Sequence, residues 1–202
     1  SINPLTKAKD VAYVRFSVPD LNLYEDWIHD FGLKIIYKDK NVIYSRGLGG
    51  DGFCHVVHRG SAKFLGFALQ LESENDLNNL YENISGCTEP HIVPGKEGEL
   101  CGGKRVSFID PVCGFLIEAV CGRSIEPLFP SRSRLEYNYG DKNLHRRPAN
   151  KLQDTSGNRS ADGNNSVHPG PPDVIKLGHV VLAAPIGTHH KMMSFMMETF
   201  GF

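Results

Sequence analysis

One structural pattern occurs twice in this sequence and begins a third time, and this repeat constrains the fold more than any other feature. In the first copy, the β-branched and aromatic run VAYVRFSV (11–18) predicts a strand. The run PDLNLYEDWIHDFG (19–32) has apolar residues at helical spacing and a terminal glycine, so it predicts a helix. Three short strand candidates follow, LKIIYK, NVIYSR and GFCHVVHR. The unit spanning 11–59 is therefore predicted to be βαβββ.

The second copy spans residues 63–121 and has the same order of elements. KFLGFALQL (63–71) predicts a strand, and SENDLNNLYENISG (73–86) predicts a helix with Ser73 as its N-cap. The strand candidates HIV, KRVSFID and GFLIEAV complete the unit. Tyr13 and Phe67, 54 positions apart, take equivalent places in the two first strands. Residues 1–121 are predicted to form one α+β domain from two βαβββ modules.

The end of the sequence begins the unit again. IKLGHVVLAAP predicts a strand, and IGTHHKMMSFMMETFGF predicts a helix that closes on Phe-Gly, as the first helix does. Matching Pro19 to Pro185 places His179 opposite Tyr13. Residues 174–202 are therefore expected to be the first strand and helix of an incomplete second domain.

A linker is expected between these parts, over residues 122–173. The stretch from about 154 to 173 consists almost wholly of Ser, Gly, Asn, Asp and Pro. Such a composition cannot bury enough apolar area to offset the entropy of ordering, so this stretch is predicted to be flexible.

Charge and cysteine content narrow the class of protein. The net charge of −1 gives no basic surface for nucleic acid or an anionic membrane. The sequence has no apolar run long enough to span a bilayer and no apolar segment of a signal peptide near its start. Its five cysteines form no CxxC motif and are expected to be reduced. We expect a cytoplasmic protein, and the sequence leaves both a monomer and a homo-oligomer open.

Paired βαβββ units resemble the vicinal oxygen chelate superfamily, which includes glyoxalase I, bleomycin-resistance proteins and the type I extradiol dioxygenases. The segment FIDPVCGFLIEAV (108–120) is similar to the closing strand of that superfamily, with Asp110-Pro111, Gly114 and Glu118 at matching places. Two such domains joined by a linker most resemble catechol 2,3-dioxygenases. The resemblance implies a cupped mixed sheet formed by the two modules.

This resemblance also implies a chemistry. Extradiol dioxygenases hold Fe(II), occasionally Mn(II), with two histidines and one carboxylate, and leave positions open for a small aromatic diol and O₂. These ligands belong to the second domain, and His179 matches the first of them. The other two ligands would come from later strands, so these 202 residues are expected to be inactive in ring cleavage.

The first domain is not expected to hold the metal. Tyr13 and Phe67 occupy its two first-strand positions, and a phenylalanine cannot ligate an ion. Glu118 is expected to be paired or hydrogen-bonded locally. His55 and His58, three apart on one strand, would point to opposite faces and could not share an ion.

The predicted C-terminal helix carries two adjacent histidines and a stripe of methionines. His189 and His190 are predicted to be exposed polar residues. The methionine stripe is predicted to face the core of the second domain, and it comprises Met192, Met193, Met196 and Met197.

Two other functions remain open at this point. The chain could be a non-enzymatic binding module of the bleomycin-resistance type, with aromatic and polar groups lining the cup. A glyoxalase-type isomerase or lyase would need metal ligands on all four module ends, and Tyr13 and Phe67 argue against it.

Overall fold

The computed structural model describes residues 3–93, 101–131 and 171–202. The described part contains one mixed sheet of eight strands in the order β2-β3-β4-β1-β5-β8-β7-β6. The first module comprises β1 (Asp10–Val18), α1 (Leu21–Phe31), β2 (Lys34–Lys38), β3 (Val42–Arg46) and β4 (His55–Arg59). The second comprises β5 (Lys63–Gln70), α2 (Glu74–Asn83), β6 (His91–Ile92), β7 (Lys104–Ile109) and β8 (Leu116–Cys121). The two predicted βαβββ modules are confirmed.

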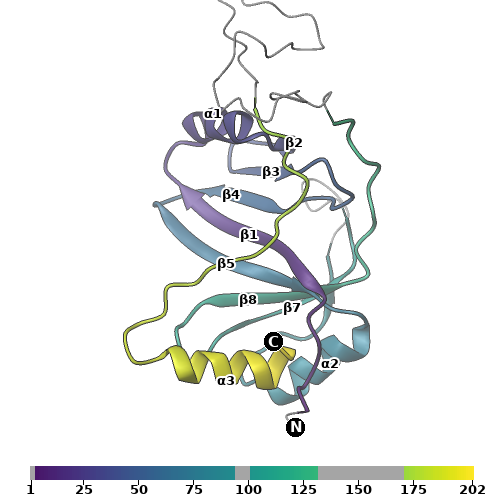
Figure 1. Ribbon diagram of the computed structural model, residues 1–202, viewed down its shortest axis with the longest axis vertical. Coiled ribbons are helices and arrows are strands. Elements are labelled where there is room, and N and C mark those ends of the chain that lie inside the picture. Colours follow the sequence, from purple (N-terminus) through teal and green to yellow (C-terminus); the bar gives the residue numbers. More distant parts are fainter. Residues whose placement is uncertain (1–2, 94–100, 132–170) are drawn as a thin grey trace, which may run out of the picture.

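The modules meet along their first strands (Figure 1). β1 and β5 pair antiparallel at the centre of the sheet. Each of them also pairs in parallel with the last strand of its own module, β4 or β8. The α+β class and the sheet of paired modules are therefore as predicted, and both edges of each central strand are occupied.

The ladder between β1 and β5 corrects one detail of the predicted repeat. Tyr13 lies opposite Ala68, whereas Phe67 lies opposite Val14. Directly opposed residues share a face of an antiparallel pair, so Tyr13 and Phe67 point to opposite faces. Their predicted equivalence is wrong by one residue. β1 and β5 shift register at two irregularities, which a count along the sequence cannot detect.

The sheet has one face covered by helices and one cup face. α1 buries Leu21 and Ile28 against its own strands, and α2 buries Leu77 and Leu80. We define the cup face by the buried side chains on the other side of the sheet, which are Tyr13, Tyr44, Phe53, Val56, Ala68 and Val120.

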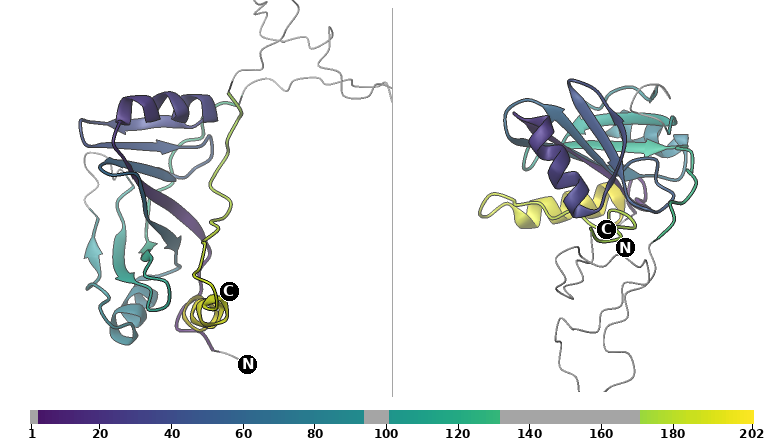
Figure 2. Two further views of the ribbon diagram at one scale, coloured as in Figure 1. Left: turned by 90° about the vertical axis from the view of Figure 1, so that its left-hand side faces the viewer. Right: turned by 90° about the horizontal axis from the view of Figure 1, so that it is seen from above.

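The C-terminal segment lies along the helix-covered face and does not form the predicted strand (Figures 1 and 2). Leu48 N and Gly49 N donate to the carbonyl oxygens of Val174 and Ile175, at 2.7 and 2.9 Å. Residues 176–185 join no strand of the described sheet. The reason is that both edges of β1 and β5 are already paired, so the segment packs on them through side chains alone.

The last helix, α3 (His189–Phe200), docks on the second module. Phe200 is fully buried, and its ring stacks on that of Phe108 with centroids 6.3 Å apart. The N-terminal segment adds backbone hydrogen bonds, because Leu5 N and Thr6 N donate to the carbonyl oxygens of Glu198 and Thr199. The third repeat unit is thereby held against the first domain at both its segment and its helix.

The methionine stripe is divided between two faces of α3. Met196 packs on the core of the first domain and Met192 is also buried, so the prediction that the whole stripe faces a second domain is wrong. Met193 and Met197 point to solvent. The prediction failed because the sequence could not show that α3 itself docks on the first domain.

The first part of the predicted linker belongs to the folded domain. Arg46 Nη2 donates to the carbonyl oxygens of Gly49 and Pro127, both at 2.6 Å, and Ile125 forms a bridge with Asp51. Residues 122–131 therefore pack against the turn after β3. The stretch predicted to be flexible lies almost wholly outside the described residues. Within the described ranges, no helix is long and apolar enough to cross a bilayer.

Candidate functional site

The cup face is built around a buried carboxylate held by two guanidinium groups. Arg15 Nε on β1 donates to Glu118 Oε2 on β8 at 2.6 Å. Arg105 Nε on β7 lies 3.3 Å from the other oxygen, Glu118 Oε1. The side chains of Arg15 and Glu118 are only 8% and 7% exposed. The prediction that Glu118 is paired locally is confirmed.

Aromatic and cationic groups pack beside this ion cluster. The Tyr13 ring lies 4.8 Å from the Arg15 guanidinium carbon and 5.3 Å from that of Arg123. The Phe53 ring lies 4.8 Å from the Tyr13 ring. Burial, and then the neighbouring Glu118 carboxylate, raise the pKa of Tyr13 to about 12. Tyr13 is therefore a neutral phenol at ordinary pH.

These residues do not fit a divalent metal ion. Glu118 is the carboxylate of the cluster, and both of its oxygens already face guanidinium groups. Two fixed positive charges at that distance oppose the entry of a further cation. Within residues 3–93, 101–131 and 171–202, no group of three or more His, Cys, Asp or Glu side chains could hold an ion. The residue that opposes Tyr13 on the cup face, Ala68, has no ligand atom either.

His55 and His58 lie on β4 and point to opposite faces of the sheet, as the sequence predicts. His55 is buried among the rings of Phe16, Tyr24 and Trp27 on the helix-covered face. The Tyr24 hydroxyl lies 3.3 Å from its Nε2 atom. Burial lowers the pKa of His55 to about 4.

This depressed pKa gives the fold a pH dependence. The unfolded chain binds a proton to His55 near pH 6.5, whereas the folded chain does so only near 4. Stability is therefore complete above about pH 6.5 and falls as the pH decreases towards 4, by on the order of 3 kcal/mol in all. Urea unfolding between pH 4 and 7 measures the loss. We expect His55→Phe to remove this component and His189→Gln, on an exposed position, to keep it.

His179 lies on the extended C-terminal segment and is exposed. It borders a cavity of about 430 Å³ between that segment and the sheet, with Phe67, Leu69 and Met196 among the other walls. The cavity is lined mainly by apolar side chains, and the described residues bring no second imidazole or group of carboxylates to it. His189 and His190 are exposed, as predicted, at the start of α3.

Comparison with solved structures identifies the architecture. The Mn(II)-bound glyoxalase from Novosphingobium aromaticivorans matches 62% of the chain with a TM-score of 0.55 and 19% identity. The chain has the vicinal oxygen chelate fold. The 2,3-dioxygenase LapB from Pseudomonas sp. KL28 matches 61% of the chain, with a TM-score of 0.50 and 20% identity. Homoprotocatechuate 2,3-dioxygenase from Brevibacterium fuscum, solved with 3,4-dihydroxyphenylacetate, matches 62% with a TM-score of 0.50 and 23% identity.

The chain spans less than half the length of these three solved structures, covering 43%, 44% and 41% of them respectively. No protein-family model matches the sequence, and no curated protein matches it either. These comparisons therefore establish the fold of the chain, which is the vicinal oxygen chelate fold.

Sequence reasoning found Tyr13 and Glu118 on this fold but missed the guanidinium groups around them. Arg15 stands two residues after Tyr13 in an otherwise apolar strand, VAYVRFSV, and therefore shares its face. A charged residue at a buried position of a strand needs a partner of opposite charge. That pattern, together with Glu118 in the apolar run GFLIEAV, was the available signal for a buried ion pair.

Proposed function

We propose that the chain is the N-terminal part of a non-haem Fe(II) extradiol dioxygenase-like protein that acts on catecholic aromatics. In this proposal residues 3–93 and 101–131 belong to a domain that contributes no metal ligand, and the third repeat unit begins the catalytic domain. We define the intact protein as the product of a coding sequence that contains these residues together with a complete second domain. The described chain alone is inactive in ring cleavage.

The main support is the contrast between the two places where a metal ligand would stand. On the cup face, Glu118 forms ion pairs with Arg15 and Arg105, so we assign it a structural role. In the third unit, His179 takes the place of Tyr13, and its imidazole is exposed. Lys9 is the one Lys or Arg side chain among the described residues that line its cavity. Two of the matched solved structures are 2,3-dioxygenases, and one of these holds a catecholic substrate.

In the intact protein, His179 would supply one neutral imidazole to Fe(II) or Mn(II). Histidine nitrogens suit such ions of intermediate softness, and an open coordination position would bring the catechol and O₂ together. His179 would thus hold the ion, while the remaining ligands lie outside the described residues.

Oxygen consumption tests the division of roles between the two domains. The purified 202-residue chain, supplied with Fe(II) and 3,4-dihydroxyphenylacetate or catechol, is expected to consume no O₂. The intact protein under the same conditions is expected to consume O₂ and to form a yellow ring-fission product. Ring cleavage by the 202-residue chain would contradict the proposal.

The alternative is a binding module of the bleomycin-resistance type, and the cup face does carry aromatic and polar groups. Tyr13, Phe53 and the ion cluster pack on one another there. Calorimetric titration of the 202-residue chain with catechol separates the two functions. Stoichiometric binding to the chain, without any ring cleavage by the intact protein, would favour the binding module.

A further inference from the structure

Helix α1 carries an exposed apolar ridge that nothing in the described residues covers. We define the α1 ridge as Leu23, Trp27 and Phe31, which follow one another at intervals of four residues and so lie along one stripe of the helix. They are 70%, 42% and 46% exposed. The rings of Trp27 and Phe31 stack with centroids 4.9 Å apart. A contiguous apolar surface with aromatic anchors is typical of a docking site.

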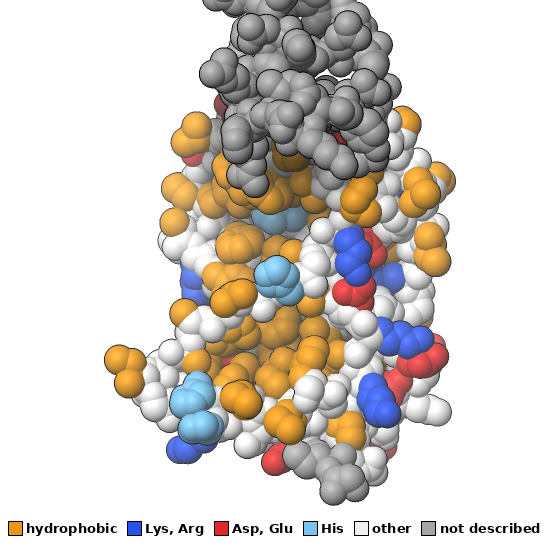
Figure 3. Space-filling model, viewed as in Figure 1, with side chains coloured by type: hydrophobic (Ala, Val, Ile, Leu, Met, Phe, Trp, Pro, Cys, Tyr) orange, Lys and Arg blue, Asp and Glu red, His pale blue; other side chains and the backbone are white. Residues whose placement is uncertain are grey.

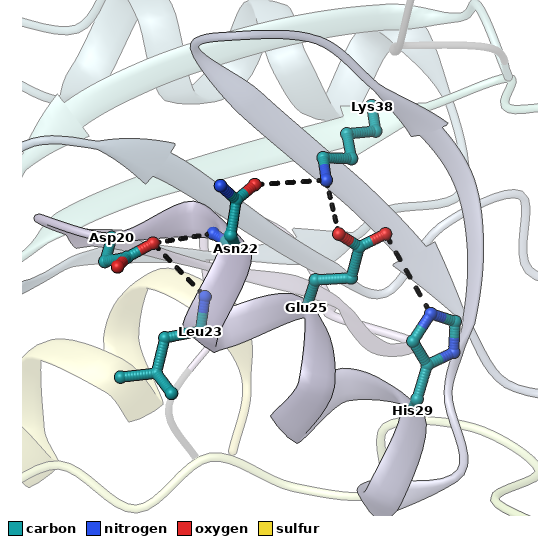
Figure 4. A network of polar contacts seen from close by, with 6 residues as sticks. All are labelled: Asp20, Asn22, Leu23, Glu25, His29 and Lys38. Atoms are coloured by element: carbon teal, nitrogen blue, oxygen red, sulfur yellow. Dashed lines mark hydrogen bonds and ion pairs between the residues drawn. The ribbon is translucent and has the colours of Figure 1, made fainter.

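The other faces of α1 are already occupied. Leu21 and Ile28 are buried against the strands of the first module. On a second face, Glu25 binds Lys38 of β2, and His29 lies 3.9 Å from the same carboxylate (Figure 4). Figure 4 also shows Leu23 directed away from this polar network. The ridge is therefore a third face, distinct from those that fix α1 to its own sheet.

Helix α3 is the counterpart of α1 in the third repeat unit, and it shows what such a ridge binds. Both helices end on Phe-Gly, and the glycines Gly32 and Gly201 adopt the same left-handed cap, with φ of 93° and 73°. Aligning the helices on this cap pairs Leu23, Trp27 and Phe31 with Met192, Met196 and Phe200. Met196 and Phe200 pack on the core of the first domain together with Phe195, and Met192 is buried.

The converse correspondence holds as well. The same alignment pairs Tyr24 and Ile28, which face the sheet of their own module, with Met193 and Met197. Met193 and Met197 are 56% and 37% exposed. In α1 the face towards its own module is covered and the ridge is exposed. In α3 the face that matches the ridge is covered by the first domain, and the face that matches Tyr24 and Ile28 is exposed.

We propose that the α1 ridge is the docking site for a second cupped domain of the same fold, which receives α1 as the first domain receives α3. The inference rests on the proposed function, because that function places such a domain in the intact protein. α1 and α3 lie at opposite ends of one side of the molecule (Figure 1), and apolar side chains gather on the face between them (Figure 3). Two reciprocal helix contacts would then join the domains.

Hydroxyl-radical footprinting read by mass spectrometry tests the docking. The chain contains a single tryptophan, and Trp27 and Phe31 are both reactive towards this probe. We expect both to be oxidised several-fold more slowly in the intact protein than in the 202-residue chain. Tyr81, 45% exposed on α2, is the internal control and should react equally in both.

Introducing a charged residue into the α1 ridge provides a second test of the docking. Trp27→Glu in the intact protein should restore the oxidation rate of Phe31 to that of the 202-residue chain, whereas Tyr81→Glu should not. Neither side chain is buried, so both variants of the 202-residue chain should fold as the parent does.

The outcomes separate this inference from the proposed function. A ring-cleaving intact protein in which Trp27 reacts as fast as in the 202-residue chain would overturn the docking alone. Protection of Trp27 in an intact protein without ring cleavage would support the docking and overturn the function. A dimeric 202-residue chain with Trp27 already protected would assign the ridge to a second copy and contradict the proposal. A coding sequence with no second domain would overturn both.

Discussion

Glu118→Gln is expected to lower the free energy of unfolding by roughly 3–5 kcal/mol, because it leaves buried guanidinium charge without its counter-charge. The Arg15 side chain is 8% exposed and donates to Glu118 at 2.6 Å, and Arg105 approaches the other carboxylate oxygen. Glutamine keeps the volume and one acceptor oxygen. It removes the negative charge around which the cup face is built.

Urea denaturation at pH 7 measures this loss. Glu74→Gln is the matched control, because Glu74 pairs with Lys104 on the surface and its side chain is 59% exposed. We expect that control to change stability by less than about 1 kcal/mol. If Glu118→Gln were as mild as Glu74→Gln, the cup would tolerate an uncompensated charge. Its centre would then be open to solvent or to a ligand, contrary to the structure.

Phe200→Ala is the second substitution with a large expected effect. Phe200 is fully buried, stacks on Phe108 and belongs to the same core as Leu77 and Leu80 of α2. Truncation of such a ring costs roughly 3–5 kcal/mol through lost burial and the cavity that remains. The loss should appear in the single unfolding transition of the domain, because α3 is part of its core.

Met193→Ala on the outer face of α3 is the matched control and should be close to neutral in the 202-residue chain. Circular dichroism during urea unfolding distinguishes two outcomes. A large shift of the whole transition supports the docked third unit. An unchanged transition for Phe200→Ala would mean that α3 is not held by the first domain, and the comparison of α1 with α3 would lose its basis.

The helices and most strands of both modules could be predicted from the sequence, because their signals are local. Apolar residues at helical spacing and the glycines that end α1 and α3 are written within a few residues of one another. The opposite orientations of His55 and His58 follow from the two-residue period of a strand. Because this pattern occurs twice, the sequence also predicted a sheet formed by two paired modules.

The errors concern relations between distant segments. Tyr13 and Phe67 were matched by counting, but the β1–β5 ladder pairs Tyr13 with Ala68 and places Phe67 on the other face. Residues 175–185 have the composition of a strand. Whether they pair depends on a free strand edge, and β1 and β5 offer none.

The candidate site was predicted only in part for the same reason. Glu118 was expected to be paired, but its partners Arg15 and Arg105 come from two other strands, 103 and 13 residues away. No local sequence pattern predicts that these three side chains contact one another. His179 was recognised through the repeat itself, and its role as a ligand remains a prediction.

The iron content of the intact protein tests the central claim most directly. His179→Ala is expected to reduce bound iron, measured by elemental analysis after anaerobic reconstitution, well below one ion per chain and to abolish ring cleavage. His190→Ala, on an exposed position of α3, is the matched control and should retain both. A His179→Ala protein that still holds one iron per chain and cleaves catechol would contradict the account.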